Sequence, residues 1–115
     1  MGQLDQAIQH LSESTHLSPS NVEPYLELGR VYLDRRQQAM ALKTYQQAIR
    51  VAATDYRPYY QAGLALKDSK EYMEAEEMLR QAANLAPDDV SVHRQLGAIV
   101  ALNLVHNHRP IGVQM

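Results

Sequence analysis

The stretch NVEPYLELGRVYLD, residues 21–34, decides the fold because its pattern returns twice further along the chain. DYRPYYQAGLALKD occupies residues 55–68 and DVSVHRQLGAIVAL occupies residues 89–102, each 34 residues after the copy before it. This period places Gly29, Gly63 and Gly97 in one column. Self-similarity at a fixed period of this length indicates structural repeats that stack on their neighbours.

The residues within each repeat predict two antiparallel helices joined by a short turn. Asn21, Asp55 and Asp89 carry side-chain oxygens that accept hydrogen bonds from the free N–H groups of a starting helix. Apolar residues then recur three or four positions apart, which is the spacing of one helix face. The sequence therefore predicts helices over residues 4–17, 22–35, 38–52, 56–69, 72–85 and 90–105.

The columns resemble the signature of the tetratricopeptide repeat family. The first complete repeat offers the residues of that signature as Tyr25, Leu28, Gly29, Tyr32, Ala41, Tyr45 and Ala48. Arg36 and Lys70 depart from it because a turn glycine is usual there, and His93 stands in place of an aromatic residue. The resemblance implies an all-α fold, a right-handed superhelix of antiparallel helix pairs whose first helices line a concave groove.

On the 34-residue period, the chain divides into one repeat domain, residues 1–105, and a C-terminal tail, residues 106–115. The domain comprises a half repeat at 1–21, full repeats at 22–55 and 56–89, and a half repeat at 90–105. We expect the first half repeat to hold only a second helix and the last half repeat to hold only a first helix.

Composition excludes several classes of function. The chain has 115 residues, enough for one domain, and its net charge of −2 provides no basic field for nucleic acid. Cysteine is absent, which excludes disulfides and cysteine-ligated zinc. The sequence contains no run of about 18 apolar residues, so no membrane span is predicted, and the N-terminus carries no leader pattern. We therefore expect a cytoplasmic protein.

No catalytic centre or cofactor site is predicted. The glycines form no phosphate-binding loop, and His106 and His108 do not share a helix face as metal ligands would. Glu71, Glu74 and Glu76 fit a solvated helix start, where the helix dipole favours negative charge. We therefore expect no enzyme activity, no cofactor and no bound metal.

A second stripe on each first helix points into the groove that the resemblance implies. Basic residues outnumber acidic ones on this stripe, which reverses the sign of the whole chain. The composition predicts a groove for an extended or helical peptide with apolar anchors and an acidic group, whereas the alternative is an ordinary solvated surface. We call these residues the groove stripe: Glu23, Leu26, Arg30, Leu33, Arg57, Tyr60, Leu64, Lys67 and Arg94.

The best-known ligand of the family is the acidic tail of heat-shock chaperones, held by a clamp of Lys, Arg and Asn side chains. In the most natural register, the clamp positions correspond to Leu26, Arg30, Gln61, Ser91 and Gln95. Leu26 and Ser91 supply neither a charge nor an amide, and Arg30 is the one charged side chain of the five, so a chaperone-tail adaptor is not predicted.

The last helix is apolar on nearly every side from Leu96 to Val105, which predicts burial beyond one neighbour. A longer array of repeats, the tail or another chain could cover it. Two forms of association are open: a two-fold dimer, and a head-to-tail contact in which the last helix of one copy and the first helix of another complete a repeat. The residues expected to mediate association are Ile99, Val100, Leu102 and Leu104.

The sequence as a whole predicts a non-catalytic scaffold that binds a protein or peptide partner. Two alternatives stay open. One is a regulatory or substrate-presenting segment of a larger enzyme, and the other is a module whose function is self-assembly into a homo-oligomer.

Overall fold

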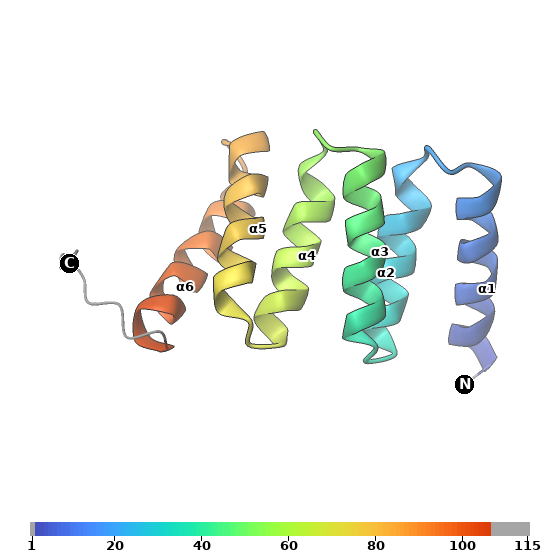
Figure 1. Ribbon diagram of the computed structural model, residues 1–115, viewed down its shortest axis with the longest axis horizontal. Helices are drawn as coiled ribbons and strands as arrows, with labels where there is room; N and C mark the ends of the chain where they lie inside the picture. Colours follow the sequence, from blue (N-terminus) through green and yellow to red (C-terminus); the bar gives the residue numbers. More distant parts are fainter. Residues whose placement is uncertain (1, 107–115) are drawn as a thin grey trace.

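The computed structural model describes residues 2–106 and folds them into helices without strands. The helices stand side by side in chain order, and each packs mainly against its neighbours in the sequence (Figure 1). The expected all-α solenoid of antiparallel helix pairs is confirmed. In order the helices are α1 (Gly2–Leu17), α2 (Val22–Asp34), α3 (Gln38–Val51), α4 (Tyr56–Asp68), α5 (Tyr72–Leu85) and α6 (Val90–His106).

The observed helices begin and end within two residues of the predicted bounds. The last helix, α6, continues to His106, the first residue of the predicted tail, while the rest of that tail lies outside the described residues. Within residues 2–106, no helix combines the length and the apolar character that a membrane crossing requires.

The predicted caps are present at the start of each first helix. Asn21 Oδ1 accepts a hydrogen bond from the backbone N–H of Glu23 at 3.2 Å, and Asp55 Oδ1 accepts one from that of Arg57 at 2.9 Å. Asp89 Oδ1 accepts a hydrogen bond from the backbone N–H of Val92 at 3.0 Å, three residues later instead of two. Each cap satisfies one of the orphan donors of a helix N-terminus, so the register of every first helix is fixed at the same column.

An aromatic column ties each first helix to the turn before it. The hydroxyl of Tyr25 donates to the carbonyl of Pro19 at 3.1 Å, and that of Tyr59 donates to the carbonyl of Ala53 at 3.0 Å. In the third repeat, Nε2 of His93 lies 2.7 Å from the carbonyl oxygen of Pro87. Because a carbonyl can only accept, this nitrogen carries the proton, and the histidine preserves the contact that tyrosine makes in the other repeats.

Two glycines allow the helices of a pair to touch. A Cβ on Gly29 would lie 2.4 Å from Cε1 of Tyr45, and a Cβ on Gly63 would lie 2.8 Å from Cγ of Leu79. Both facing side chains are fully buried. The glycine column therefore sets the distance between α2 and α3 and between α4 and α5.

The turn between the two helices of a pair contains a residue with a left-handed backbone. Arg36 has a φ of 60° and Lys70 a φ of 63°, at the positions where the family uses glycine. The next N–H reaches back to close the helix, from Gln37 to the carbonyl of Tyr32 and from Glu71 to that of Leu66, both at 2.9 Å. This is the Schellman arrangement, in which a side chain at the left-handed position carries a steric cost.

We predict that Gly29→Ala lowers the free energy of unfolding by about 1–3 kcal/mol, because the buried Tyr45 ring leaves no room for the new methyl group. The matched control is Gly97→Ala, where nothing within 4 Å meets the Cβ among the described residues. There we expect a gain of up to about 1 kcal/mol from helix propensity. Urea denaturation followed by circular dichroism measures both, and equal losses at the two sites would contradict the close-contact model.

At the turn, we predict that Lys70→Gly raises the free energy of unfolding by up to about 1 kcal/mol, because glycine adopts the left-handed region without strain. Asp68→Gly, in the last helical turn just before it, should lower the same quantity since glycine weakens a helix. Denaturant midpoints of the two variants give the test. A loss of stability in Lys70→Gly would show that the turn holds no relievable strain.

Candidate peptide-binding face

The groove stripe lies on the three first helices, α2, α4 and α6, as its spacing predicted. Glu23, Arg30 and Arg94 are exposed, whereas the other members are half-buried. The stripe therefore offers a mixed surface on which some charged ends reach water and the apolar members are partly engaged in packing.

The apolar members of the stripe also hold the repeats together. Leu26 and Leu33 pack against the buried cluster formed by Ala41, Tyr45 and Ala62. Tyr60 packs against the two other core clusters, which lie further along the stack. Only part of each of these side chains is left for a partner, so they provide shallow anchors rather than deep pockets.

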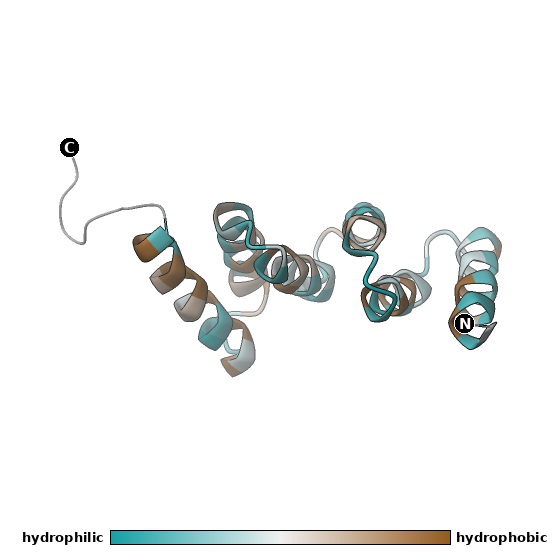
Figure 2. Cartoon of the chain, turned by 90° about the horizontal axis from the view of Figure 1, so that it is seen from below, coloured by the Kyte–Doolittle hydropathy of each residue, from teal (hydrophilic) through white to brown (hydrophobic). Residues whose placement is uncertain are grey.

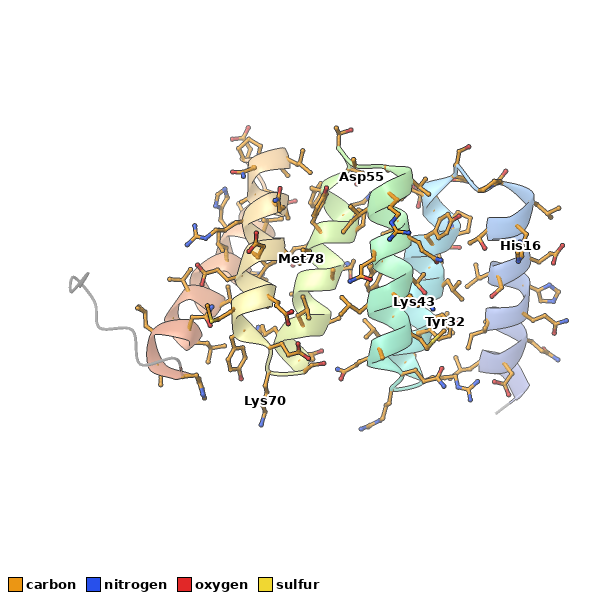
Figure 3. All side chains as sticks on the ribbon, viewed as in Figure 1. His16, Tyr32, Lys43, Asp55, Lys70 and Met78 are labelled. Atoms are coloured by element: carbon orange, nitrogen blue, oxygen red, sulfur yellow. The ribbon has the colours of Figure 1, made fainter. Side chains whose placement is uncertain are left out.

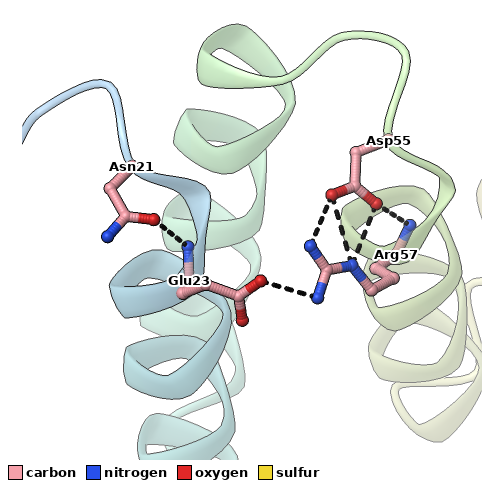
Figure 4. Close-up of polar contacts among 4 residues, drawn as sticks. All are labelled: Asn21, Glu23, Asp55 and Arg57. Atoms are coloured by element: carbon pink, nitrogen blue, oxygen red, sulfur yellow. Dashed lines mark hydrogen bonds and ion pairs between the residues drawn. The ribbon is translucent and has the colours of Figure 1, made fainter.

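Arg57 is the centre of a polar cluster that links two repeats. Its Nη2 lies 2.7 Å from Oδ2 of Asp55, and its Nη1 lies 2.9 Å from Oε2 of Glu23 (Figure 4). The side-chain hydrogen bond from Arg57 lowers the pKa of Asp55, and the two carboxylates raise the pKa of Arg57. From the sequence we expected this guanidinium to be available to a ligand, but in the structure it has two carboxylate partners.

The remaining positive charge of the stripe lies toward its C-terminal end. Arg30 and Asp34 form an exposed pair at 4.0 Å, one helical turn apart. Lys67 donates from Nζ to Oε1 of Gln95 at 2.9 Å, a neutral partner that leaves its charge uncompensated. Within residues 2–106 neither Lys67 nor Arg94 forms an ion pair, so α4 and α6 together present two unbalanced cations.

Sequence reasoning missed a hollow on the opposite side of the stack, between α3 and α5. Its cavity of about 470 Å³ reaches Ala62 and Leu66 of α4, and Met78 lies on the α4 side of α5 (Figure 3). Apolar residues on α3 and α5 were visible in the sequence, but helical spacing alone does not distinguish residues that line a hollow from residues of the core. The lining residues are Leu42, Gln46, Ile49, Ala62, Leu66, Met73, Glu74, Glu77 and Met78.

The expected association residues of α6 separate into two groups. Ile99 is fully buried against Leu66 and Leu79, and Leu102 packs against the same cluster. Ile99 is therefore a core residue of this chain, which corrects its expected place on a docking surface. Val100 and Leu104 are half-buried.

Histidines and carboxylates do not gather into a metal site in the described part of the chain. No group of three such side chains that could hold an ion occurs there. The ring of His106 lies 5.0 Å from that of Tyr72, a tilted aromatic contact, while His108 is outside the described residues.

Comparison with known families gives matches along most of the chain. A family model described as tetratricopeptide repeat matches residues 22–55 and 56–89, and a second, described as TPR repeat, matches residues 1–35. A comparison with curated proteins found no match.

Several solved structures share the fold. MamA is 25% identical with a TM-score of 0.79, over 92% of this chain and 62% of its own, so the chain spans less than two thirds of it. The first TPR of Spaghetti bound to an HSP90 peptide is 19% identical, with a TM-score of 0.80 and coverage of 88% and 80%. The Yersinia enterocolitica type III secretion chaperone SycD, in complex with a peptide of the translocator YopD, is 21% identical, with a TM-score of 0.79 and coverage of 89% and 83%.

The arginine-centred cluster predicts how stability changes with pH. Asp55 has a lowered pKa in the folded chain, so the unfolded chain binds its proton more readily. The stabilisation is therefore present above about pH 4, the ordinary range of an aspartate, and is lost as pH falls through the lowered pKa. Asp55→Asn retains an amide oxygen for the cap but removes this titration, so its stability should fall less between neutral and acidic pH. Unfolding curves across that range measure the effect, and parallel profiles for the two proteins would contradict it.

Proposed function

The chain belongs to the tetratricopeptide repeat family, and from this premise we propose that it is a non-catalytic scaffold that binds a segment of a partner protein on the groove stripe. Repeats of this kind contact only their neighbours and expose one extended surface. Function then comes from the side chains on that surface rather than from an enclosed site.

The observation that carries the proposal is the pair of unbalanced cations at Lys67 and Arg94 on a chain of net charge −2. An acidic group of the partner would form charge-assisted hydrogen bonds there. The half-buried Leu64, one turn before Lys67 on α4, and the exposed parts of Leu26 and Leu33 offer apolar contact along the same stripe. This combination favours a segment with an acidic group and spaced apolar side chains.

Two of the similar structures support the mode of binding, because Spaghetti holds an HSP90 peptide and SycD holds a peptide of YopD. They do not identify the ligand of this chain. Leu26 and Ser91 stand at clamp positions of the chaperone-tail binders but carry neither a charge nor an amide, so we propose a different acidic segment.

We expect a double variant, Lys67→Glu with Arg94→Glu, to lose binding. Random peptides displayed on phage are selected on the folded chain, and the best peptide is then titrated by fluorescence polarisation. Selected peptides should contain Asp or Glu together with apolar residues, and the double variant should bind the chosen peptide at least about tenfold more weakly. Arg57 is left unchanged because its removal would leave Asp55 and Glu23 without their partner.

The matched control is Lys43→Glu with Arg50→Glu, which makes the same change of charge at exposed positions of α3. The control should bind within about twofold of the unmodified chain, since a distant surface charge contributes little. Equal weakening by the two double variants would mean that net charge, and not the groove stripe, decides binding. Selected peptides without acidic residues would overturn the proposed ligand class.

A further inference from the structure

The glycine column is filled in two repeats and open in the third. Gly29 faces Tyr45 of α3 and Gly63 faces Leu79 of α5, so each glycine receives a large side chain from the helix paired with its own. Nothing within 4 Å meets a Cβ on Gly97 among residues 2–106. The face of α6 that carries this glycine therefore has room for a large side chain from another helix, and no described residue of the chain fills it.

The neighbours of Gly97 on α6 are suited to burial. Val100 stands in the column of Leu66, which is only 5% exposed because α5 covers it. Leu104 continues the same face one turn later, and hydrophobic residues run along most of α6 (Figure 2). We call Gly97, Val100 and Leu104 the α6 seat.

At the other end of the stack, α1 presents the complementary helix face. Its Ala7, Leu11 and Ser14 stand in the columns of the fully buried residues Ala41, Tyr45 and Ala48 of α3. In α5 the same columns hold Ala75, Leu79 and Ala82, which are also fully buried. No residue of α1 is fully buried in the described structure, and Ala7, Leu11 and Ser14 are half-buried, so this face around Leu11 is covered only in part.

We propose that α1 of a second copy docks on the α6 seat, with its Leu11 against Gly97. The column arithmetic fixes this register, because Leu11 precedes Tyr45 by 34 residues just as Gly97 follows Gly63 by 34. The contact reproduces between two chains the pairing that α4 and α5 make within one. It goes beyond peptide binding on the groove stripe and uses different residues.

The contact joins two different faces, so it is heterologous and does not close by two-fold symmetry. Each copy then carries one seat and one docking helix, and copies add end to end into open chains or a ring. A two-fold dimer through α6, by contrast, would need no contribution from α1. This difference makes the two arrangements separable by mutation.

The test uses Gly97→Gln and Leu11→Gln in the full chain, studied by sedimentation velocity over a wide range of concentration. Glutamine at position 97 has open space in the single chain but fills the seat, and glutamine at position 11 removes the side chain that would occupy it. We expect the unmodified chain to assemble as concentration rises and each variant to associate at least about tenfold more weakly.

An equimolar mixture of the two variants gives the decisive result. The Gly97→Gln chain keeps an intact α1, and the Leu11→Gln chain keeps an intact seat, so the mixture should form a one-to-one complex and nothing larger. Ala98→Gln is the matched control because Ala98 is exposed and belongs to the next column, so this variant should assemble like the unmodified chain. Circular dichroism confirms folding, and Ala7→Gln replaces Leu11→Gln if that variant loses helix.

Three outcomes would overturn the proposal. A strict monomer at the highest concentration would mean that the seat does not receive a second copy. Undiminished assembly of the Leu11→Gln chain, with Gly97→Gln monomeric, would identify a two-fold dimer through α6. Mixed variants that remain separate, when each is folded, would also exclude the head-to-tail contact.

Discussion

The close approach of two helices at a glycine is the contact on which the rest of the structure depends. It brings α3 onto α2 through Tyr45 and α5 onto α4 through Leu79, and the 34-residue period repeats the geometry along the stack. The approach has a cost at Tyr45, whose buried hydroxyl has no hydrogen-bond partner among the described residues and whose pKa burial raises to about 12. The contact tolerates this polar atom because the ring fills the space that the glycine leaves.

The helices could be predicted closely because their signals are local. The caps at Asn21, Asp55 and Asp89 act within three residues of themselves, and the turns at Arg36 and Lys70 follow the same column as the family's glycine. Such interactions form between residues close together in the sequence, so they recur in every repeat that keeps the same residue types at the same positions. The groove stripe was placed on the expected helices for the same reason.

The partners of charged side chains were harder to predict because they form between repeats. Glu23 and Arg57 share a column, and stacking brings opposite charges in one column face to face. That signal was available once the period was known, but the added contact with Asp55 depends on the rotamer of the arginine. On α6 the apolar run did not show which side of the helix faces inward, because one of the buried residues is polar. Asn103 is fully buried and donates from Nδ2 to the carbonyl of Tyr72 at 2.9 Å.

Neighbour-only stacking also connects the two proposed surfaces. Because each repeat is held by the next, the same geometry that aligns α2, α4 and α6 along the groove stripe leaves a pairing face on α6 and another on α1. If copies join there in register, the stripe continues from one chain to the next. The cations at Lys67 and Arg94 then lie on the last two first helices of each copy and recur once per copy. A partner with several acidic segments would bind such an assembly more tightly than a single chain, because its later contacts form at high effective concentration.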